Sequence, residues 1–128
     1  MSEQRADWLE VARKDWTRAL YMLEGEDVEA AGFFLQQSLE KYMKAFLLQH
    51  GWRLRELHEL DALLDDTAKY KPDLERFRDL CERVSGYYLA DRYPPLGSLG
   101  LTSGDIEGDL REAGKFIQAM FPGEELSA

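Results

Sequence analysis

Polar side chains with the chemistry to hold an anion share one side of an expected helix in the middle of the chain. Gln37, Lys41 and Lys44 are spaced by four and three residues, which places them on one helix face. The two lysines would contact a phosphate, and the Gln37 amide would orient a polar group of the ligand. Glu40 precedes Lys44 by four residues, the favourable order for a helical ion pair. The alternative is therefore the polar flank of a core helix, with Glu40 neutralising Lys44.

Two other short segments add a histidine and an arginine. His58 follows Arg53 and Arg55 and is expected in the first turn of a third helix, whereas Arg92 and Tyr93 are expected at the end of a fourth. A histidine can act as a general base and a nearby cation can stabilise a developing negative charge. Each has a structural alternative, since an arginine at a helix C-terminus is favoured by the helix dipole without any function.

Motifs for metal or nucleophilic catalysis are missing from the sequence. It contains no glycine-rich phosphate loop and no His-Glu-x-x-His or Cys-x-x-Cys spacing. The two histidines, His50 and His58, have no partner at ligand spacing. Cys81 is the single cysteine and falls in an apolar helical pattern, so we expect a small buried side chain. We therefore predict no metal site.

Composition indicates one globular domain with an acidic surface. The 128 residues are 45% hydrophobic and 32% charged, and the formal net charge is −9. This charge argues against sequence-independent binding to duplex DNA. Residues 41–55 are the exception, because they contain four basic residues and no acid. Such a basic segment could meet a phosphate or an acidic partner, or could consist of ordinary surface charges.

The expected cellular setting follows from the same composition. No apolar run is long enough to cross a membrane, and the first seven residues carry no apolar signal region. A lone cysteine fits a reducing compartment. We therefore expect a cytoplasmic protein.

Hydrophobic periodicity predicts an all-α fold of five helices. No segment alternates with period two for long enough to form a strand. We predict an up-and-down four-helix-bundle core with a C-terminal fifth helix, the first two helices forming an antiparallel pair. Thr102 or Ser103 can cap the fifth helix, and Asp105 follows Thr102 by three residues in the spacing of a capping box. The expected helices cover residues 7–23, 26–51, 57–64, 72–93 and 103–121.

Several short motifs together carry a family likeness. They follow one another in the order Gln36-Gln37-x-x-Glu40-Lys41-x-x-Lys44-Ala45, Gly51, His58-Glu59-Leu60-x-x-Leu63-Leu64 and Arg92-Tyr93-Pro94. In this order they resemble the HEPN (higher eukaryotes and prokaryotes nucleotide-binding) domain family. The likeness extends over roughly residues 5 to 121 and thus nearly the whole chain, read as a single domain.

The resemblance implies a homodimer with no required cofactor. Small prokaryotic members of the family commonly act with a minimal nucleotidyltransferase partner, often as a toxin–antitoxin pair, and a nucleotide is an expected ligand. Its site would combine Gln37, Lys41 and Lys44 with His58 and the Arg92–Tyr93 pair. Other members are metal-independent endoribonucleases that carry an Arg-x4–6-His motif near the start of the family's late helix.

This sequence departs from the ribonuclease pattern. Arg92 is followed by Tyr-Pro-Pro-Leu-Gly-Ser-Leu and not by a histidine. Arg53 and His58 match the spacing but precede the third helix, which is the wrong place. We therefore favour a non-catalytic dimer. An endoribonuclease with His58 as base and Arg53 or Arg92 as stabilising cation is the second hypothesis, and a purely structural interaction module is the third.

Overall fold

The computed structural model describes residues 2–53, 55–57, 59–87 and 100–126. Within them the chain forms five α-helices and one 3-10 helix, and no strand, which confirms the all-α prediction. His58, Arg92 and Tyr93 lie outside the described residues. The elements are α1 (Ser2–Glu24), α2 (Val28–Gln49), α3 (Leu60–Tyr70), η1 (Pro72–Phe77), α4 (Arg78–Ser85) and α7 (Ser103–Met120).

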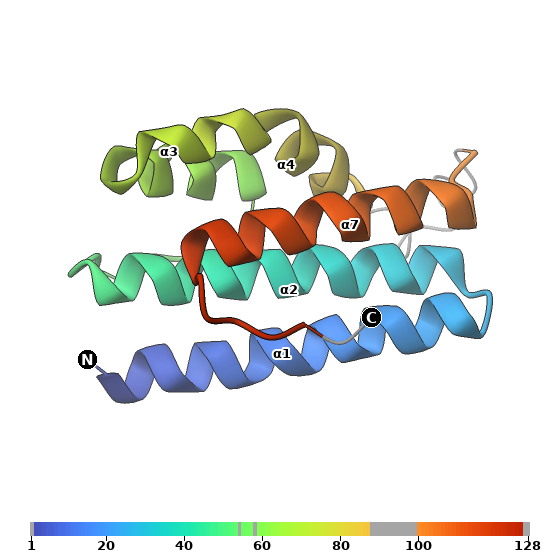
Figure 1. Cartoon of the computed structure of the whole chain (residues 1–128), viewed down its shortest axis with the longest axis horizontal. Helices are drawn as coiled ribbons and strands as arrows, with labels where there is room; N and C mark the ends of the chain where they lie inside the picture. The colour runs from blue at the N-terminus through green and yellow to red at the C-terminus, as the bar shows by residue number, and fades with distance from the viewer. Residues whose placement is uncertain (1, 54, 58, 88–99, 127–128) are drawn as a thin grey trace.

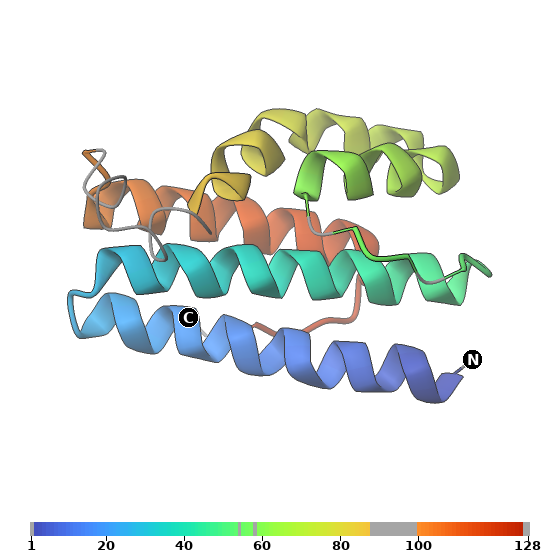
Figure 2. The ribbon, with the colours of Figure 1, turned by 180° about the vertical axis from the view of Figure 1, so that it is seen from behind.

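Helix α2 is the centre of the bundle. It forms an antiparallel pair with α1 and separates α1 from the layer of α3 and α4, while α7 also packs along it (Figures 1 and 2). The α1–α2 turn uses Glu26 in the left-handed region, with φ of 63°. Asp27 then caps α2, because its carboxylate accepts a hydrogen bond from the Ala30 amide at 3.2 Å. The predicted antiparallel pair therefore forms.

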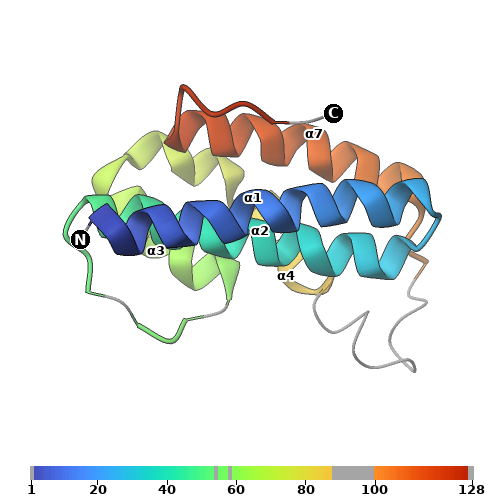
Figure 3. The same cartoon turned by 90° about the horizontal axis from the view of Figure 1, so that it is seen from below.

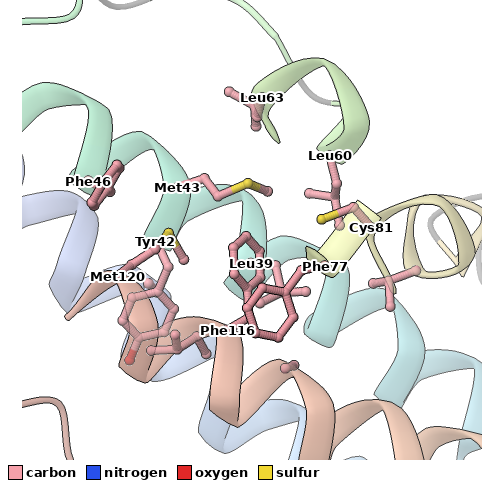
Figure 4. Packing of buried hydrophobic residues seen from close by; sticks show 14 of the residues in the cluster. Leu39, Tyr42, Met43, Phe46, Leu60, Leu63, Phe77, Cys81, Phe116 and Met120 are labelled. Atoms are coloured by element: carbon pink, nitrogen blue, oxygen red, sulfur yellow. The ribbon is translucent and has the colours of Figure 1, made fainter. Parts of the chain in front are cut away.

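The apolar stripe of α2 supplies most of the central core. Leu39, Tyr42 and Met43 are fully buried and point toward side chains from the other helices (Figure 4). Phe77 of η1 stacks on Phe116 of α7 with ring centroids 4.8 Å apart. Cys81 is buried in this core, as predicted, and burial raises the pKa of its thiol to about 12. The thiol therefore stays protonated and packs as a small apolar group.

The third helix begins and ends later than the sequence suggested. It begins at Leu60 and not at Leu57, so Leu57 and Glu59 precede the helix. The reason is tertiary, because the Ser85 hydroxyl of α4 accepts a hydrogen bond from the Leu60 amide at 3.2 Å. The helix also continues to Tyr70, and the buried Asp66 within it accepts a hydrogen bond from the Trp52 indole at 3.0 Å.

Two other helix boundaries also differ from the prediction. The first helix begins at Ser2, five residues earlier than expected. The predicted fourth helix is a 3-10 helix over Pro72–Phe77 before the α-helix begins at Arg78. Fraying and 3-10 turns at helix ends are poorly encoded in hydrophobic periodicity, which is why the sequence pattern did not indicate these positions.

Helix α7 begins as predicted and ends in a reversal of the chain. The Thr102 hydroxyl accepts a hydrogen bond from the Asp105 amide at 3.1 Å, and the Asp105 carboxylate accepts one from the Thr102 amide at 2.9 Å. This confirms the capping box. After Met120 the chain turns at Pro122 and Gly123 and runs back along the bundle (Figures 1 and 3).

None of the helices in the described part of the chain combines the length and the apolar character that a membrane crossing requires.

Candidate functional site

A continuous line of polar side chains runs along the contact between α1 and α2, and we call it the polar seam. Each member is hydrogen-bonded to the next, so the seam joins one helix pair over several turns. It contains three of the residues predicted for a ligand site. Its members are Asp15 and Arg18 from α1, and Gln36, Gln37, Glu40, Lys41 and Lys44 from α2.

One end of the seam is organised by a buried aspartate. Lys41 Nζ lies 2.5 Å from Asp15 Oδ2, and Arg18 Nη1 lies 2.7 Å from Asp15 Oδ1. Lys41 also donates to Gln37 Oε1 at 3.1 Å. The Asp15 side chain is only 3% exposed, whereas Lys41 is 16% exposed. Two cations thus face one carboxylate, and this end of the seam has a net positive charge that reaches the surface mainly at Arg18, whose side chain is 50% exposed.

The other end of the seam is a buried ion pair. Lys44 Nζ lies 2.9 Å from Glu40 Oε2, and the two side chains are 3% and 5% exposed. The ammonium group also lies 5.1 Å from the centroid of the Trp8 ring, within the range of a cation–π contact. Gln36 donates to Glu40 at 3.3 Å and accepts from Gln37 at 2.7 Å, which joins the two ends.

The structure describes three of the six residues predicted for the ligand site. Gln37, Lys41 and Lys44 come together in one network, and the predicted Glu40–Lys44 pair is confirmed. Both lysines are already paired with carboxylates, and Lys44 is covered. A ligand role for Gln37, Lys41 and Lys44 stays a prediction, as do the roles of the undescribed His58, Arg92 and Tyr93.

Sequence reasoning missed the α1 contribution to this region. Asp15 and Arg18 were not predicted to take part, although Asp15 lies beside the buried Trp16 in the apolar pattern of α1. An acid next to a buried tryptophan was the available signal, because a buried carboxylate needs a partner. The pattern could not say that the partner would be Lys41, 26 residues away.

The basic segment 41–55 is dispersed rather than gathered into one patch. Two of its four cations belong to the seam, and Arg55 lies 3.5 Å from the Asp66 carboxylate. Arg53 is exposed near the end of α2. The local excess of positive charge that the sequence predicted is therefore largely compensated by acids outside this segment, namely Asp15, Glu40 and Asp66.

A second polar cluster fixes the end of α4 against α7. Tyr87 donates to Asp109 at 2.5 Å, and Arg83 bridges Asp109 and Glu112 at 3.0 and 2.9 Å. Burial first, and then the hydrogen bond to Asp109, raises the pKa of the Tyr87 phenol, which keeps it a donor. Its ring also lies over Gly32 of α2, where an added Cβ would be 3.1 Å from it. This cluster positions the last described residue before the predicted Arg92–Tyr93 motif.

Among the described residues, no group of three or more His, Cys, Asp or Glu side chains is arranged to hold a metal ion.

Comparison with known proteins agrees with the all-α fold described above. The sequence model of the HEPN domain family matches residues 6–125. Among solved structures, the chain is similar to the crystal structure of TT1696 from Thermus thermophilus, with a TM-score of 0.76 and 26% sequence identity. The match covers 91% of this chain and 95% of that one. No individually curated protein is significantly similar in sequence.

Proposed function

The chain belongs to the HEPN domain family, and from that premise we propose that it acts as a non-catalytic homodimer that binds a nucleotide or a minimal nucleotidyltransferase partner. The pair would resemble a toxin–antitoxin system. The observation that carries the proposal is the family match over residues 6–125, combined with the missing histidine after Arg92. The family includes nucleotide-binding and ribonuclease-like modules, and this chain lacks the ribonuclease motif at the place where the family carries it.

Among the described residues predicted for the ligand site, Lys41 is the one best placed to contact a phosphate. Its ammonium group has three N–H donors, and within the described residues two of them are directed at Asp15 and Gln37. Its side chain is also 16% exposed, in contrast to Lys44. An incoming phosphate oxygen would accept the remaining N–H, and Arg18 would keep Asp15 paired if Lys41 moved toward the ligand.

Calorimetric titration with ATP tests the ligand part of this proposal. We expect the wild-type chain to bind, and the Lys41→Ala/Arg92→Ala double variant to lose binding. Lys115→Ala is the matched control, because Lys115 is an exposed lysine on α7 far from the seam in sequence, and it should bind like wild type. If the double variant behaves like the control in both ligand and partner assays, the chain is a structural interaction module.

The partner and the dimer need separate measurements. Co-expression with a minimal nucleotidyltransferase should give a complex that co-purifies, and size-exclusion chromatography with light scattering should give the mass of a dimer. A monomer at micromolar concentration would contradict the dimer. RNA cleavage that His58→Ala abolishes would replace this proposal with the endoribonuclease hypothesis.

A further inference from the structure

The C-terminal segment after α7 is held against the bundle as a strap, which we define as residues 121–126. Figure 1 shows it in dark red, turning back across α2 toward α1. The turn is closed by the Glu124 amide, which donates to the Phe121 carbonyl at 2.9 Å. Gln118 of α7 donates to the Glu124 carbonyl at 3.3 Å, and the Leu126 side chain packs near Gly114. The strap is thus short and depends on few contacts.

The strap is held most firmly by the Glu124 carboxylate, which accepts three hydrogen bonds from Arg13 and Tyr42; we call these donors the seat. Arg13 Nε and Nη2 lie 2.8 and 3.0 Å from the two oxygens of Glu124, and Tyr42 donates to the same carboxylate at 2.6 Å. The Glu124 side chain is 7% exposed. Arg13 belongs to α1 and Tyr42 to α2, so both donors sit on the helix pair and not on the strap. A planar arginine fork with a convergent hydroxyl is suited to carboxylate and phosphate oxygens alike.

The seat continues into a positively charged hollow on the outer face of α1. This open hollow has a volume of about 370 Å³ and is lined by Arg13, Lys14, Thr17 and Arg18. It brings three cations and a hydroxyl together, although Lys14 also lies 3.7 Å from the exposed Glu10 and Arg18 lies 2.7 Å from the buried Asp15. Arg13 is common to the seat and the hollow, and Glu124 is its counter-charge. Of these three cations the Glu124 carboxylate contacts Arg13, whereas a linked pair of phosphates would also reach Lys14 and Arg18, whose side chains are 59% and 50% exposed.

We propose that the Arg13–Tyr42 seat and the adjoining hollow form a binding site for a diphosphate group, and that the strap plugs this site with the Glu124 carboxylate. The plug imitates one phosphate of the ligand. Lifting of the strap would free the Arg13 fork and the Tyr42 hydroxyl while leaving the helices in place. This site is formed by α1, Tyr42 of α2 and the strap. It shares Arg18 with the polar seam but does not depend on the ligand role proposed for Lys41.

Adjacent glutamates in the strap provide a matched pair of variants. Glu124→Gln keeps the shape of the plug but removes its charge, and Glu125→Gln removes the same charge from an exposed neighbour. In calorimetric titrations of the full chain with pyrophosphate, we expect Glu124→Gln to bind at least tenfold more tightly than wild type. Glu125→Gln should match wild type. Adding Arg13→Gln to Glu124→Gln should remove the gain, whereas adding Lys115→Ala, at an exposed lysine of α7, should leave it.

Hydrogen exchange on the wild-type chain gives a second test that needs no variant. Saturating pyrophosphate should increase exchange of the Glu124 amide and its strap neighbours, while the amides within α7 stay protected. Equal pyrophosphate affinity of the two glutamine variants would overturn the proposal. So would a gain that survives Arg13→Gln, or pyrophosphate binding that leaves strap exchange unchanged.

Discussion

The polar seam and the strap both bury a carboxylate against a cation, but in different mechanical settings. The side chains of Glu40 in the seam and Glu124 in the strap are 5% and 7% exposed, so burial hardly distinguishes them. Glu40 lies on a 22-residue helix at the centre of the bundle, whereas Glu124 lies on a short segment that follows a turn. Similar pair chemistry should therefore have different consequences when one partner is removed.

The difference lies in what the remaining charge can do. If Lys44 is removed, the Glu40 carboxylate stays buried unless the α1–α2 contact opens, and it loses the ammonium group that lies 2.9 Å away. If the Glu124 contact is broken, the strap can lift and its polar groups can be hydrated while the helices stay packed. The seam should thus control global stability, and the strap should control local opening.

Lys44→Ala is expected to have the largest effect. Removal of one partner from a buried ion pair should lower the free energy of unfolding by about 3–5 kcal/mol. Chemical denaturation measures this directly. Replacing both Glu40 and Lys44 by apolar residues of similar volume should recover part of the loss, because no charge is then buried. A loss below about 1 kcal/mol for Lys44→Ala would show that the seam is hydrated in solution.

Glu124→Gln should have an intermediate effect. Loss of the charged hydrogen bonds from Arg13 and Tyr42 should reduce the free energy of unfolding by about 1–3 kcal/mol. Thermal and chemical denaturation of Glu124→Gln and Glu125→Gln separates the effect of the Glu124 contact from that of a general change in charge. Substitution of the exposed Glu125 should change the free energy of unfolding by less than about 0.5 kcal/mol. Equal stability of the two variants would show that the Glu124 contact does not stabilise the folded chain.

The strap should also make stability depend on acid pH. The hydrogen bond from Arg13 lowers the pKa of Glu124 below its ordinary 4.5, although burial opposes it. The folded state therefore binds this proton less readily than the unfolded state, so the stabilisation is present above pH 4.5 and is lost as the pH falls through the lowered value. Denaturation across this range should show the gap between wild type and Glu124→Gln closing at low pH. A constant gap would contradict the assignment.

The smallest effect is expected at an exposed pair on α1. Lys14 lies 3.7 Å from Glu10, and their side chains are 59% and 67% exposed. Lys14→Ala should change the free energy of unfolding by no more than about 0.5 kcal/mol, because water screens both charges. The same denaturation series measures it. An effect as large as that of Glu124→Gln would mean that burial of a charged pair does not decide its contribution to stability.

Local features of this protein followed from its sequence. Hydrophobic periodicity predicted the helix that becomes α2, and the Thr102–Asp105 capping box marked the start of α7. The Glu40–Lys44 pair was likewise visible at a spacing of four residues. All of these are decided within one or two helical turns, where backbone geometry alone sets which side chains meet.

Features that depend on contacts between distant residues did not follow from the sequence. The start of α3 is set by Ser85, 25 residues from Leu60. The partner of Lys41 is Asp15, and the seat of Glu124 joins residues 82 and 111 positions away in the chain. No local pattern specifies such pairs, because they depend on how the helices pack.

The sequence by itself therefore determined an all-α chain of HEPN type, its central helix and the identities of its charged side chains. Only the tertiary structure decided which of those charges are neutralised, buried or left at the surface. The physical reason is that a charge in a protein is defined by its surroundings, and burial and pairing arise when helices from distant parts of the chain come together. Lys41 and Lys44 illustrate this, since they are three residues apart on one helix but differ in exposure and in partner.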